Sequence, residues 1–433
     1  MLIVVLTALC AWGALASPAL AEVFRVTRTG DPPPNACKPR DCSLREAVIA
    51  ANEALEQDTI RLDDKTYRLT REGEDDLSLV GDLDVISALR VRGKGPRATT
   101  IQGAWESDPD RLFHVTTPVP LGLTGLTLRG GADVFEGGAI YGAGASTVST
   151  RGVHFLRNRG QYGAVALYGD GNLTRTLFKK NVGTECCSGL YSLGDVVVLR
   201  KTEFIENHAV DDTGAVYNEG ARMIIRDSLF ARNTAGTEAG ALISDSPSIE
   251  IYNTTFSGNR ADEHAGAIEF SSGSGGQLNN VTITRNVADA DDDGVGDGGA
   301  IYSRNSVTVS LRNTIVGGNA DRGGESPECT MLNPPAFISL GFNLFGNMQG
   351  CTFAPATGDR LGLAPGLRPL RDNGGFTRTH ALGRRSKALN RGSDAPIGTG
   401  DPTACMRRDQ RGVKRPQRGR CDIGAFERKR KRK

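Results

Sequence analysis

One repeat of the chain reads TGAVYNEGARMIIRDSLFARNTAGTE over residues 213–238. It begins with a Gly-small-apolar unit, TGAVYN, and closes with the F-x-x-N unit of Phe230 and Asn233. Apolar residues alternate with small or polar ones in both units, which is the pattern of a half-buried strand, and the glycine and asparagine residues between them favour turns. The stretch therefore predicts short strands joined by tight turns.

Both units recur along the chain at a nearly constant spacing. The first unit appears as GGAIYG at 137, YGAVAL at 162, SGLYSL at 188, TGAVYN at 213, AGALIS at 239, AGAIEF at 265 and GGAIYS at 298. The second appears as Phe155/Asn158, Phe178/Asn181, Phe204/Asn207, Phe230/Asn233 and Phe256/Asn259, and continues as Ile283/Asn286 and Val316/Asn319. A period of this kind, about 26 residues here, indicates a solenoid in which each repeat stacks on the next.

Aligning the repeats predicts columns of like residues inside the solenoid. Apolar columns comprise Ile140, Val165, Val216, Leu242, Ile268 and Ile301, and also Leu173, Leu199, Ile225, Ile251, Leu278 and Leu311. The phenylalanines form a stack, and the asparagines are expected to turn a corner in the left-handed conformation and to hydrogen-bond along the axis. We predict an all-β fold, a single-stranded right-handed parallel β-helix with seven clear coils and further degenerate coils in residues 58–130.

The stretch CSLREAVIAAN at residues 42–52 is the most helix-like part of the mature chain. Ser43 and Glu46 form a capping box, and Leu44, Ala47, Val48 and Ala51 fall on one helical face. A β-helix needs its open end covered, since unpaired strands and exposed core would otherwise template further pairing. We predict that this short helix is the N-terminal cap.

The chain begins with an apolar run that ends in small residues, and Ala19 and Ala21 fit a signal cleavage site before Glu22. The run lacks a positive n-region, and an uncleaved membrane anchor is the alternative. Nine cysteines agree with export. By proximity we expect Cys37–Cys42, Cys329–Cys351 and Cys405–Cys421 to form disulfides, while Cys186 and Cys187 are either an adjacent disulfide or two free thiols.

Several motifs resemble known families of exported bacterial proteins. The GGAI and F-x-x-N units are similar to the repeats of polymorphic outer-membrane proteins. The stretch CSLREAVIAAN resembles the CSLREA domain, and LAPGLRPLRDNGGFTRTHAL with DQRG at 409 and CDIGAFE at 421 resembles the choice-of-anchor Q domain. At the level of fold the chain resembles pectin lyases. The resemblance implies a secreted or cell-envelope protein, with no implied activity.

The chain departs from these families at its C-terminal end. We expect neither a β-barrel segment nor a hydrophobic sorting helix there, and Lys387 and Asn390 stand where the Q-type family tends to have Pro and Asp. The expected division is a signal peptide at 1–21, a CSLREA-type cap at 22–57, β-helix coils at 58–320, C-terminal coils and end cap at 321–427 and a basic tail at 428–433. The chain has a formal charge of +2, so without the six basic residues of the tail it carries −4.

The gap between the last two Gly-small-apolar units is longer than the others, and the added residues include the aspartate run DADDDGVGD. Its candidate ligands for Ca²⁺ are Asp289, Asp291, Asp293, the Val295 carbonyl and Asp297, with Gly294 at the turn position. The pattern resembles thrombospondin-type and dockerin-type loops. Ala300 replaces the bidentate glutamate of position twelve, so we predict weak calcium binding. The alternative is an acidic solvated loop.

The outward residues that follow each Gly-small-apolar unit read Tyr141, Ala166, Ser192, Tyr217, Ile243, Glu269 and Tyr302. Tyr141, Tyr217, Glu269 and Tyr302 are the candidate binding residues, because the tyrosines could stack on sugar rings. The column offers one carboxylate where glycoside hydrolysis needs two. Asp211 and Asp212 could join Glu238 and His264 of later coils, but no residue is assigned a catalytic role.

These observations favour a secreted or envelope protein, expected to be monomeric, that adheres or binds polysaccharide. The alternative is a pectate-lyase-like lyase or a hydrolase that acts on an acidic polysaccharide, in which Ca²⁺ and an Arg or Lys base would take part. The expected partner is an extracellular or envelope polysaccharide or a surface protein. Nucleic acid is not expected as a partner of an exported chain, and the basic tail favours anionic polymers.

Overall fold

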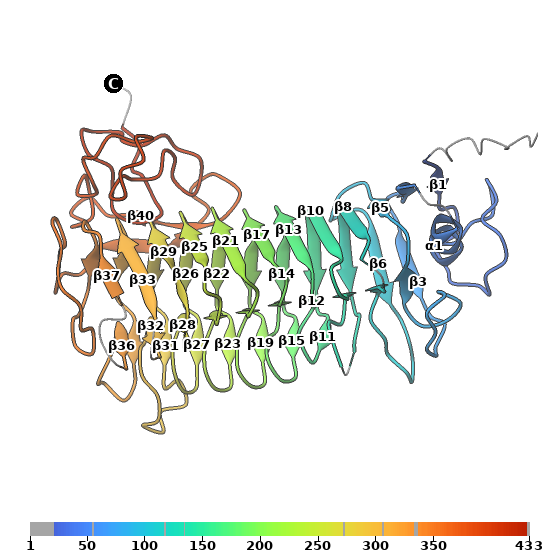
Figure 1. Ribbon diagram of the computed structural model, residues 1–433, viewed down its shortest axis with the longest axis horizontal. Coiled ribbons are helices and arrows are strands. Elements are labelled where there is room, and N and C mark those ends of the chain that lie inside the picture. The colour runs from blue at the N-terminus through green and yellow to red at the C-terminus, as the bar shows by residue number, and fades with distance from the viewer. Residues whose placement is uncertain are drawn as a thin grey trace, which may run out of the picture.

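The computed structural model is a right-handed parallel β-helix of about ten turns, as the repeats predict. It describes residues 21–430 apart from 54–55, 117, 134, 272, 305–306 and 333–336. The expected signal peptide therefore lies almost entirely outside the described residues. Figure 1 shows the coils stacked into a rod, with the N-terminal helix at one end and the C-terminal segment beside the other. In the described residues, no helix is long and apolar enough to cross a membrane.

The repeat at 213–238 forms one full coil. It contributes β20 (Val216–Asn218), β21 (Arg222–Arg226), β22 (Leu229–Ala231) and β23 (Thr234–Ala235) before the chain returns at β24 (Leu242–Ser244). β24 pairs with β20 in parallel, and Val216 lies opposite Leu242. Each coil thus adds strands to the same sheets, and the columns of like residues in the sequence become columns in space.

The strands make three parallel sheets and one small antiparallel pair. The ten-stranded sheet consists of β4 (Leu83–Val85), β7 (Phe113–Val115), β9 (Ile140–Gly142), β12 (Val165–Leu167), β16 (Leu190–Ser192), β20, β24, β28 (Ile268–Phe270), β32 (Ile301–Ser303) and β36 (Cys329–Met331). The seven-stranded sheet consists of β11 (Arg159–Gly160), β15 (Val182–Gly183), β19 (His208–Ala209), β23, β27 (Arg260–Ala261), β31 (Val287–Ala288) and β35 (Ala320–Asp321).

The third parallel sheet has 21 strands, mostly two from each coil. They are β1 (Val23–Arg25), β2 (Asp58–Arg61), β3 (Thr66–Leu69), β5 (Leu89–Arg92), β6 (Thr100–Gly103), β8 (Pro120–Arg129), β10 (Thr147–Leu156), β13 (Asp170–Thr174), β14 (Leu177–Lys179), β17 (Val196–Arg200), β18 (Glu203–Ile205), β21, β22, β25 (Ile249–Tyr252), β26 (Thr255–Ser257), β29 (Gly275–Asn279), β30 (Thr282–Thr284), β33 (Thr308–Arg312), β34 (Ile315–Val316), β37 (Phe337–Ser339) and β38 (Leu344–Phe345). The antiparallel pair is β39 (Leu367–Arg371) and β40 (Thr379–Leu382).

The phenylalanine and asparagine columns both run along the axis as predicted. The rings of Phe155, Phe178, Phe204, Phe230 and Phe256 stack in sequence with centroids 4.6–4.8 Å apart. In the asparagine ladder each side-chain amide donates to the amide oxygen of the next coil, for example from Asn207 to Asn233 at 2.9 Å. These buried bonds keep the polar groups of the corner satisfied.

The prediction that the asparagines of the ladder adopt the left-handed backbone conformation is wrong. The left-handed residue at the corner is the one immediately before each asparagine: Arg157, Lys180, Glu206, Arg232, Gly258, Arg285 and Gly318, with φ between 54° and 76°. The asparagine is needed for its side chain, since its amide donates and accepts along the ladder while also donating to a backbone carbonyl of the previous coil. The repeat therefore selects Asn for hydrogen bonding and not for backbone freedom.

The N-terminal cap has the predicted form. α1 (Leu44–Asn52) begins at Ser43 with both bonds of the capping box, and it buries Leu44, Ala47, Val48 and Ala51. It contacts β1, β2 and β4 at the start of the rod. The Cys37–Cys42 disulfide closes the loop that leads into the helix.

The C-terminal segment lies beside the rod, whereas we expected it to cover the end. Gln410 Nε2 donates to the Ser228 carbonyl at 2.9 Å, and Asn253 Nδ2 donates to the Arg408 carbonyl at 2.7 Å, so residues from β39 onward rest on the outer face of the 21-stranded sheet. Met348, Phe353 and Leu361 instead pack against the last coil of the core. The expected disulfides Cys329–Cys351 and Cys405–Cys421 are present in these two regions.

Candidate functional site

The outward residues of the ten-stranded sheet form one continuous column. Strand register places them in the order Asp84, His114, Tyr141, Ala166, Tyr191, Tyr217, Ile243, Glu269, Tyr302 and Thr330. Ser192, which we expected in this column, is fully buried, and Tyr191 takes its place. The reason is that Val165 pairs with Leu190, so this coil is shorter by a single residue than the alignment assumed.

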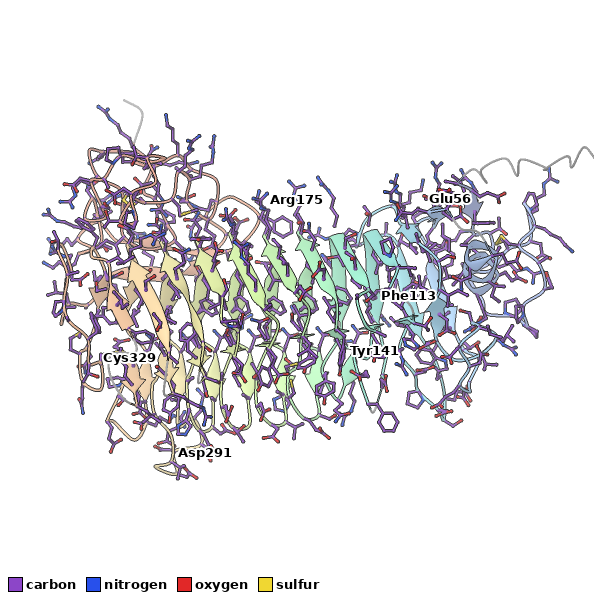
Figure 2. All side chains as sticks on the ribbon, viewed as in Figure 1. Glu56, Phe113, Tyr141, Arg175, Asp291 and Cys329 are labelled. Carbon is purple, nitrogen blue, oxygen red and sulfur yellow. A yellow bond between two sulfur atoms is a disulfide. The ribbon has the colours of Figure 1, made fainter. Side chains whose placement is uncertain are left out.

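Tyrosine rings cover this sheet from β9 to β20. Tyr191 stacks on Tyr162 with centroids 4.7 Å apart and meets Tyr168 and Tyr217 edge to face. Tyr141 meets Tyr168 at 5.6 Å and extends the array toward the N-terminal end. We name these five residues the tyrosine face; Figure 2 labels Tyr141 near the middle of the rod. Such offset and edge-to-face contacts fix the ring orientations.

Carboxylates hold the tyrosine hydroxyl groups in place. Tyr217 donates to Asp245 at 3.1 Å, Tyr168 donates to Glu136 at 3.3 Å, and Tyr191 donates to Glu219. Burial, followed by the charge of the nearby acids, raises the pKa of Tyr217, and burial and Glu219 raise the pKa of Tyr191. The hydroxyls therefore stay protonated at neutral pH and the rings keep one orientation.

A pocket of about 480 Å³ opens on the tyrosine face. Its described lining comprises Tyr162, Tyr191 and Tyr217 with Glu185, Cys186, Asp211, Asp212 and Glu219. These residues offer aromatic rings and four carboxylates, and none of them is basic. Cys186 and Cys187 are unpaired and buried, and burial raises the pKa of the Cys186 thiol, which leaves it unreactive. The pocket can therefore accept hydroxyl or ammonium donors over an aromatic surface.

Two of the four expected binding residues are covered by their surroundings. Glu269 is fully buried and pairs with Arg304, which also pairs with Glu238. Tyr302 is 5% exposed and stacks on His264 with centroids 4.3 Å apart. Burial and the charge of Glu238 raise the pKa of Glu269 to about 7. Tyr141 and Tyr217 are partly exposed. Of the four expected binding residues, these two are the ones that a ligand can contact.

The aspartate run at 289–297 forms an acidic loop near the C-terminal end of the rod, and Figure 2 labels Asp291 where the loop projects from the coils. Carboxylate oxygens of Asp289, Asp291 and Asp293 lie within 4.8 Å of one another. Asp289 is fully buried; its Oδ1 accepts from the backbone of Asp293 and Gly294, while its Oδ2 has no hydrogen-bond partner among the residues that the structure describes. A buried carboxylate oxygen without a partner fits a cation ligand.

The two other expected calcium ligands, Val295 and Asp297, lie outside the group of three carboxylates. The Val295 side chain is 54% exposed and its backbone N–H donates to Asp293. Asp297 is outside the group of three carboxylates, and its carbonyl accepts from Ala265 at 3.0 Å. Arg260 and Arg322 both donate to the Ala290 carbonyl, which fixes the start of the loop. The loop geometry thus presents three carboxylates together.

The sequence analysis missed several residues of these sites. Tyr162 and Tyr168 lie on either side of β12, outside the aligned columns, and no repeat pattern marks them. Tyr191 could have been found by aligning SGLY with GAIY and GAVY, which shortens one coil by a residue. Asp84 and His114 head the outward column and, with Asp76, form a second group of side chains with metal-ligand chemistry.

Comparison with known proteins agrees with the fold. A family model described as a right handed beta helix region matches residues 138–320, which is less than half of the chain. No curated protein sequence matches. Solved structures that match include the mannuronan C-5 epimerase AlgE6 A-module of Azotobacter vinelandii, at 14% identity and a TM-score of 0.33, over 73% of this chain and 99% of that one. The PL6 family alginate lyase AlyGC matches at 12% identity and a TM-score of 0.33, over 90% of this chain and 60% of that one. Likenesses this distant carry no argument about activity, and the chain's own coils establish that it is a parallel β-helix protein.

Proposed function

We propose that this protein binds a neutral or amino-sugar polysaccharide along the tyrosine face. The carrying observation is the array of five tyrosines across successive coils, with a pocket that contains carboxylates and no basic residue. A sugar ring has one apolar face of C–H groups and a rim of hydroxyls. Aromatic rings suit the first, and carboxylate acceptors suit the second.

The charge of the pocket favours some glycans over others. Glu185, Asp211, Asp212 and Glu219 would repel the carboxylates of a polyuronate, and they would attract the ammonium groups of an amino sugar. The hydroxyl groups of a neutral glycan can donate to the same oxygens. The proposal therefore keeps the expectation of polysaccharide binding and assigns a neutral or basic glycan to this face, in contrast to the acidic polysaccharide of the lyase or hydrolase alternative.

The direct test is isothermal titration of the full mature chain with a neutral cellohexaose, a chitosan hexamer and an oligogalacturonate. We expect the neutral or amino-sugar oligomer to bind, and we expect any binding of the oligogalacturonate to be unchanged in Tyr217→Ala, because that glycan does not use the tyrosine face. Tyr217→Ala should weaken binding at least tenfold, because aromatic anchors carry much of a binding surface's energy. Tyr252→Ala is the control, since Tyr252 is a buried tyrosine on β25 of another sheet whose hydroxyl likewise donates to a carboxylate, that of Glu250. Equal losses in both variants, or no binding of either glycan, would refute the proposal.

We further propose that the acidic loop binds calcium through Asp289, Asp291 and Asp293. The support is the partnerless, buried Oδ2 of Asp289 beside two other carboxylates. Calcium takes six to eight oxygen ligands, so the Val295 carbonyl, Asp297 and water would have to complete the shell. The ion would brace the long turn between β31 and β32.

We also propose that the protein functions outside the cytoplasm. Three disulfides support this, because such bonds persist in oxidising compartments. Retention of the three disulfides in protein isolated from the medium or envelope of its native cells would test it. Recovery only from the cytoplasm with free thiols would contradict it.

Glycoside hydrolysis at the same pocket is the second candidate function. Burial, and then the charges of Glu238 and Asp211, raise the pKa of Asp212 to about 6, which suits a general acid beside a second carboxylate. A lyase fits less well, because Arg304 already pairs with Glu238 and Glu269 and is not free to act as a base.

Incubation with the neutral, amino-sugar and acidic glycans, with Ca²⁺ and with chelator, separates these functions. New reducing ends that disappear in Asp212→Asn and persist in Asp195→Asn would establish hydrolysis, since Asp195 is an exposed aspartate outside the lining of the pocket. Unsaturated product that needs Ca²⁺ would establish a lyase and overturn the binding proposal. Binding without either product supports the binding function.

A further inference from the structure

The C-terminal part of the chain is strongly basic. Residues 367–433 contain 20 lysines and arginines against six aspartates and glutamates, a net charge of +14. Because the whole chain is +2, the remaining residues carry −12. The rod and its lateral C-terminal segment therefore have opposite charges, and the basic character extends well beyond the six-residue tail.

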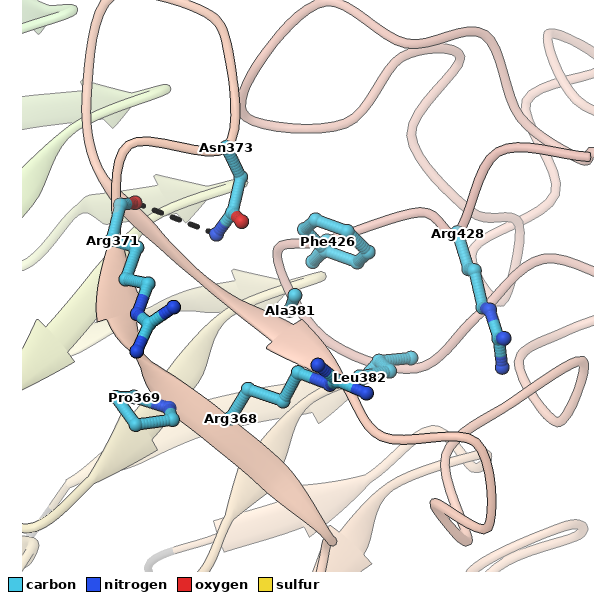
Figure 3. A pocket seen from close by; sticks show the side chains of 8 residues that line it. All are labelled: Arg368, Pro369, Arg371, Asn373, Ala381, Leu382, Phe426 and Arg428. Carbon is cyan, nitrogen blue, oxygen red and sulfur yellow. Dashed lines mark hydrogen bonds between the residues drawn. The ribbon is translucent and has the colours of Figure 1, made fainter. Parts of the chain in front are cut away.

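A pocket of about 350 Å³ lies in this segment. Arg368, Arg371 and Arg428 stand around it, and Ala381, Leu382 and Phe426 provide an apolar floor (Figure 3). The two strands β39 and β40 supply Arg368, Arg371 and Leu382. No acidic side chain is among the described residues that line the pocket. Its volume is at the small end of the range for ligand sites, which suits a single sugar-sized group.

Arg368 and Arg371 are free to receive an anion, and Arg428 lies beside Asp422, whose carboxylate accepts from the Arg428 backbone N–H. Arg368 and Arg371 are exposed and Arg428 is half-buried. None of the three guanidinium groups forms an ion pair in the described part of the chain, whereas Arg411 and Arg415 of the same segment pair with Asp409 and Glu427. The segment therefore neutralises its buried arginines and leaves those of the pocket unpaired.

The apolar floor is held rigidly. Phe426 lies under the guanidinium of Arg411, whose carbon is 3.6 Å from the ring centroid. Asp409 accepts from Arg411 Nε at 2.9 Å and Nη2 at 2.6 Å, and also from the Glu427 backbone N–H at 2.9 Å. The residues of the DQRG and CDIGAFE motifs thus fix the floor of the pocket, which preserves its shape before a ligand arrives.

We propose that this pocket binds a uronate residue of an anionic polysaccharide. The sugar ring would lie on Phe426 and Leu382, and its carboxylate would face Arg368, Arg371 or Arg428. The planar fork of an arginine matches a carboxylate with two parallel hydrogen bonds, and a net charge of +14 draws in a polyanion. The apolar floor distinguishes this site from a bare cluster of charges, because a simple anion would gain nothing from it.

The pocket is independent of the function proposed for the tyrosine face. It has the opposite charge, it lies on a different part of the molecule, and it selects the glycans that the tyrosine face repels. The two proposals can fail separately, since variants at one surface leave the other intact. A protein with both sites would connect an anionic polymer to a neutral or basic one.

The test uses the full mature chain and a purified oligogalacturonate hexamer, with the same hexamer after reduction of its carboxyl groups. Titration should show binding of the first that weakens by at least tenfold after carboxyl reduction. The triple variant Arg368→Ala/Arg371→Ala/Arg428→Ala should lose at least tenfold, because it removes the charge-assisted bonds. The matched control Arg384→Ala/Arg385→Ala/Lys387→Ala removes the same charge from exposed positions outside the pocket.

Three results would overturn the proposal. Equal losses in the two triple variants would show that the segment attracts anions without a site. Equal affinity for polyphosphate of similar charge would show that neither the carboxylate nor the ring is recognised. Salt-sensitive self-association, abolished by the pocket variant, would identify the acidic rod of a second copy as the occupant. Far-ultraviolet circular dichroism of each variant checks that loss of binding is not loss of fold.

Discussion

Arg45 and Asp31 form a bidentate ion pair that is completely enclosed in the N-terminal cap. Nε and Nη2 of Arg45 donate to the two oxygens of Asp31 at 2.7 and 2.9 Å. The guanidinium group also donates to the backbone carbonyls of Ser78, Val80, Gly81 and Asp82. This arginine of the CSLREA stretch thereby ties α1 to a loop that follows it far along the sequence.

Replacement of Arg45 by methionine should destabilise the cap by about 3–5 kcal/mol, because it removes the donor of four carbonyls and leaves the enclosed Asp31 carboxylate with no counter-charge and only the backbone N–H groups of Thr70 and Arg71 as donors. The measurement is the free energy of unfolding from urea titration. Arg28→Met is the control, since Arg28 pairs with Asp41 at an exposed position where an ion pair contributes at most about 1 kcal/mol. Similar values for the two variants would show that the enclosed pair does not stabilise the cap.

The asparagine ladder predicts a second stability effect. Asn207 donates to Asn233 at 2.9 Å and to the Phe178 carbonyl at 3.1 Å, and its oxygen accepts from the backbone and side chain of Asn181. Asn207→Ala should cost about 3 kcal/mol, because several buried polar groups lose their partner. Asn172→Ala removes an exposed amide on β13 and should change stability by less than about 0.5 kcal/mol. A small loss at Asn207 would mean that water replaces the ladder without cost.

The regular part of this fold could be predicted because its stabilising contacts repeat at a nearly constant spacing. The Phe155 to Phe256 stack and the asparagine ladder follow directly from that spacing, and the amphipathic face of α1 follows from helical periodicity. Where a coil changes length, the predicted assignment of residues to columns fails. The coil from Val165 to Leu190 is one residue shorter than the alignment of the repeats assumed. For this reason the sequence analysis placed Ser192 in the outward column, where the structure has Tyr191.

The lateral position of the C-terminal segment could not be predicted in the same way. It depends on single hydrogen bonds between residues far apart in the sequence, such as those from Gln410 to Ser228 and Thr255 to Gln410. Such contacts do not recur at a regular spacing along the sequence, so no repeat pattern predicts them. The arginine pocket also depends on this packing, since Phe426 and Arg368 are brought together only by the folded segment.

The contact between His380 and Ser257 should make the lateral segment sensitive to acid. His380 is buried, its Nδ1 donates to the Arg368 carbonyl at 2.6 Å, and its Nε2 therefore accepts from Ser257 at 2.8 Å. Burial, with a smaller effect of Arg285, lowers the pKa of His380 to about 4. In the unfolded chain the imidazole titrates near 6.5. Its contribution to stability is thus fully present above about pH 6.5 and is lost as the pH falls toward 4.

His380→Gln should remove this part of the pH dependence. A shift of one pKa unit corresponds to about 1.4 kcal/mol, so the wild type should lose a few kcal/mol relative to the variant between pH 7 and pH 4.5. Unfolding free energies at several pH values give the measurement. His208→Gln, at an exposed position, should keep the wild-type slope. Parallel pH profiles for His380→Gln and wild type would contradict the prediction.

Calcium should stabilise the folded chain through Asp289. The loop lacks the glutamate of position twelve, so we expect a dissociation constant of about 10⁻⁴–10⁻³ M, as in extracellular modules. At ten times that concentration the stabilisation is about 1.4 kcal/mol, which appears as a higher melting temperature with Ca²⁺ than with chelator. Asp289→Asn should abolish the increase, because it removes the charge of the buried carboxylate whose Oδ2 has no hydrogen-bond partner in the described part of the chain. Asp292→Asn is the matched control: Asp292 is exposed, its φ of 70° is tolerated by asparagine, and it is outside the three-carboxylate group. If both variants lose the effect equally, the loop attracts cations only through its overall charge and holds no calcium site.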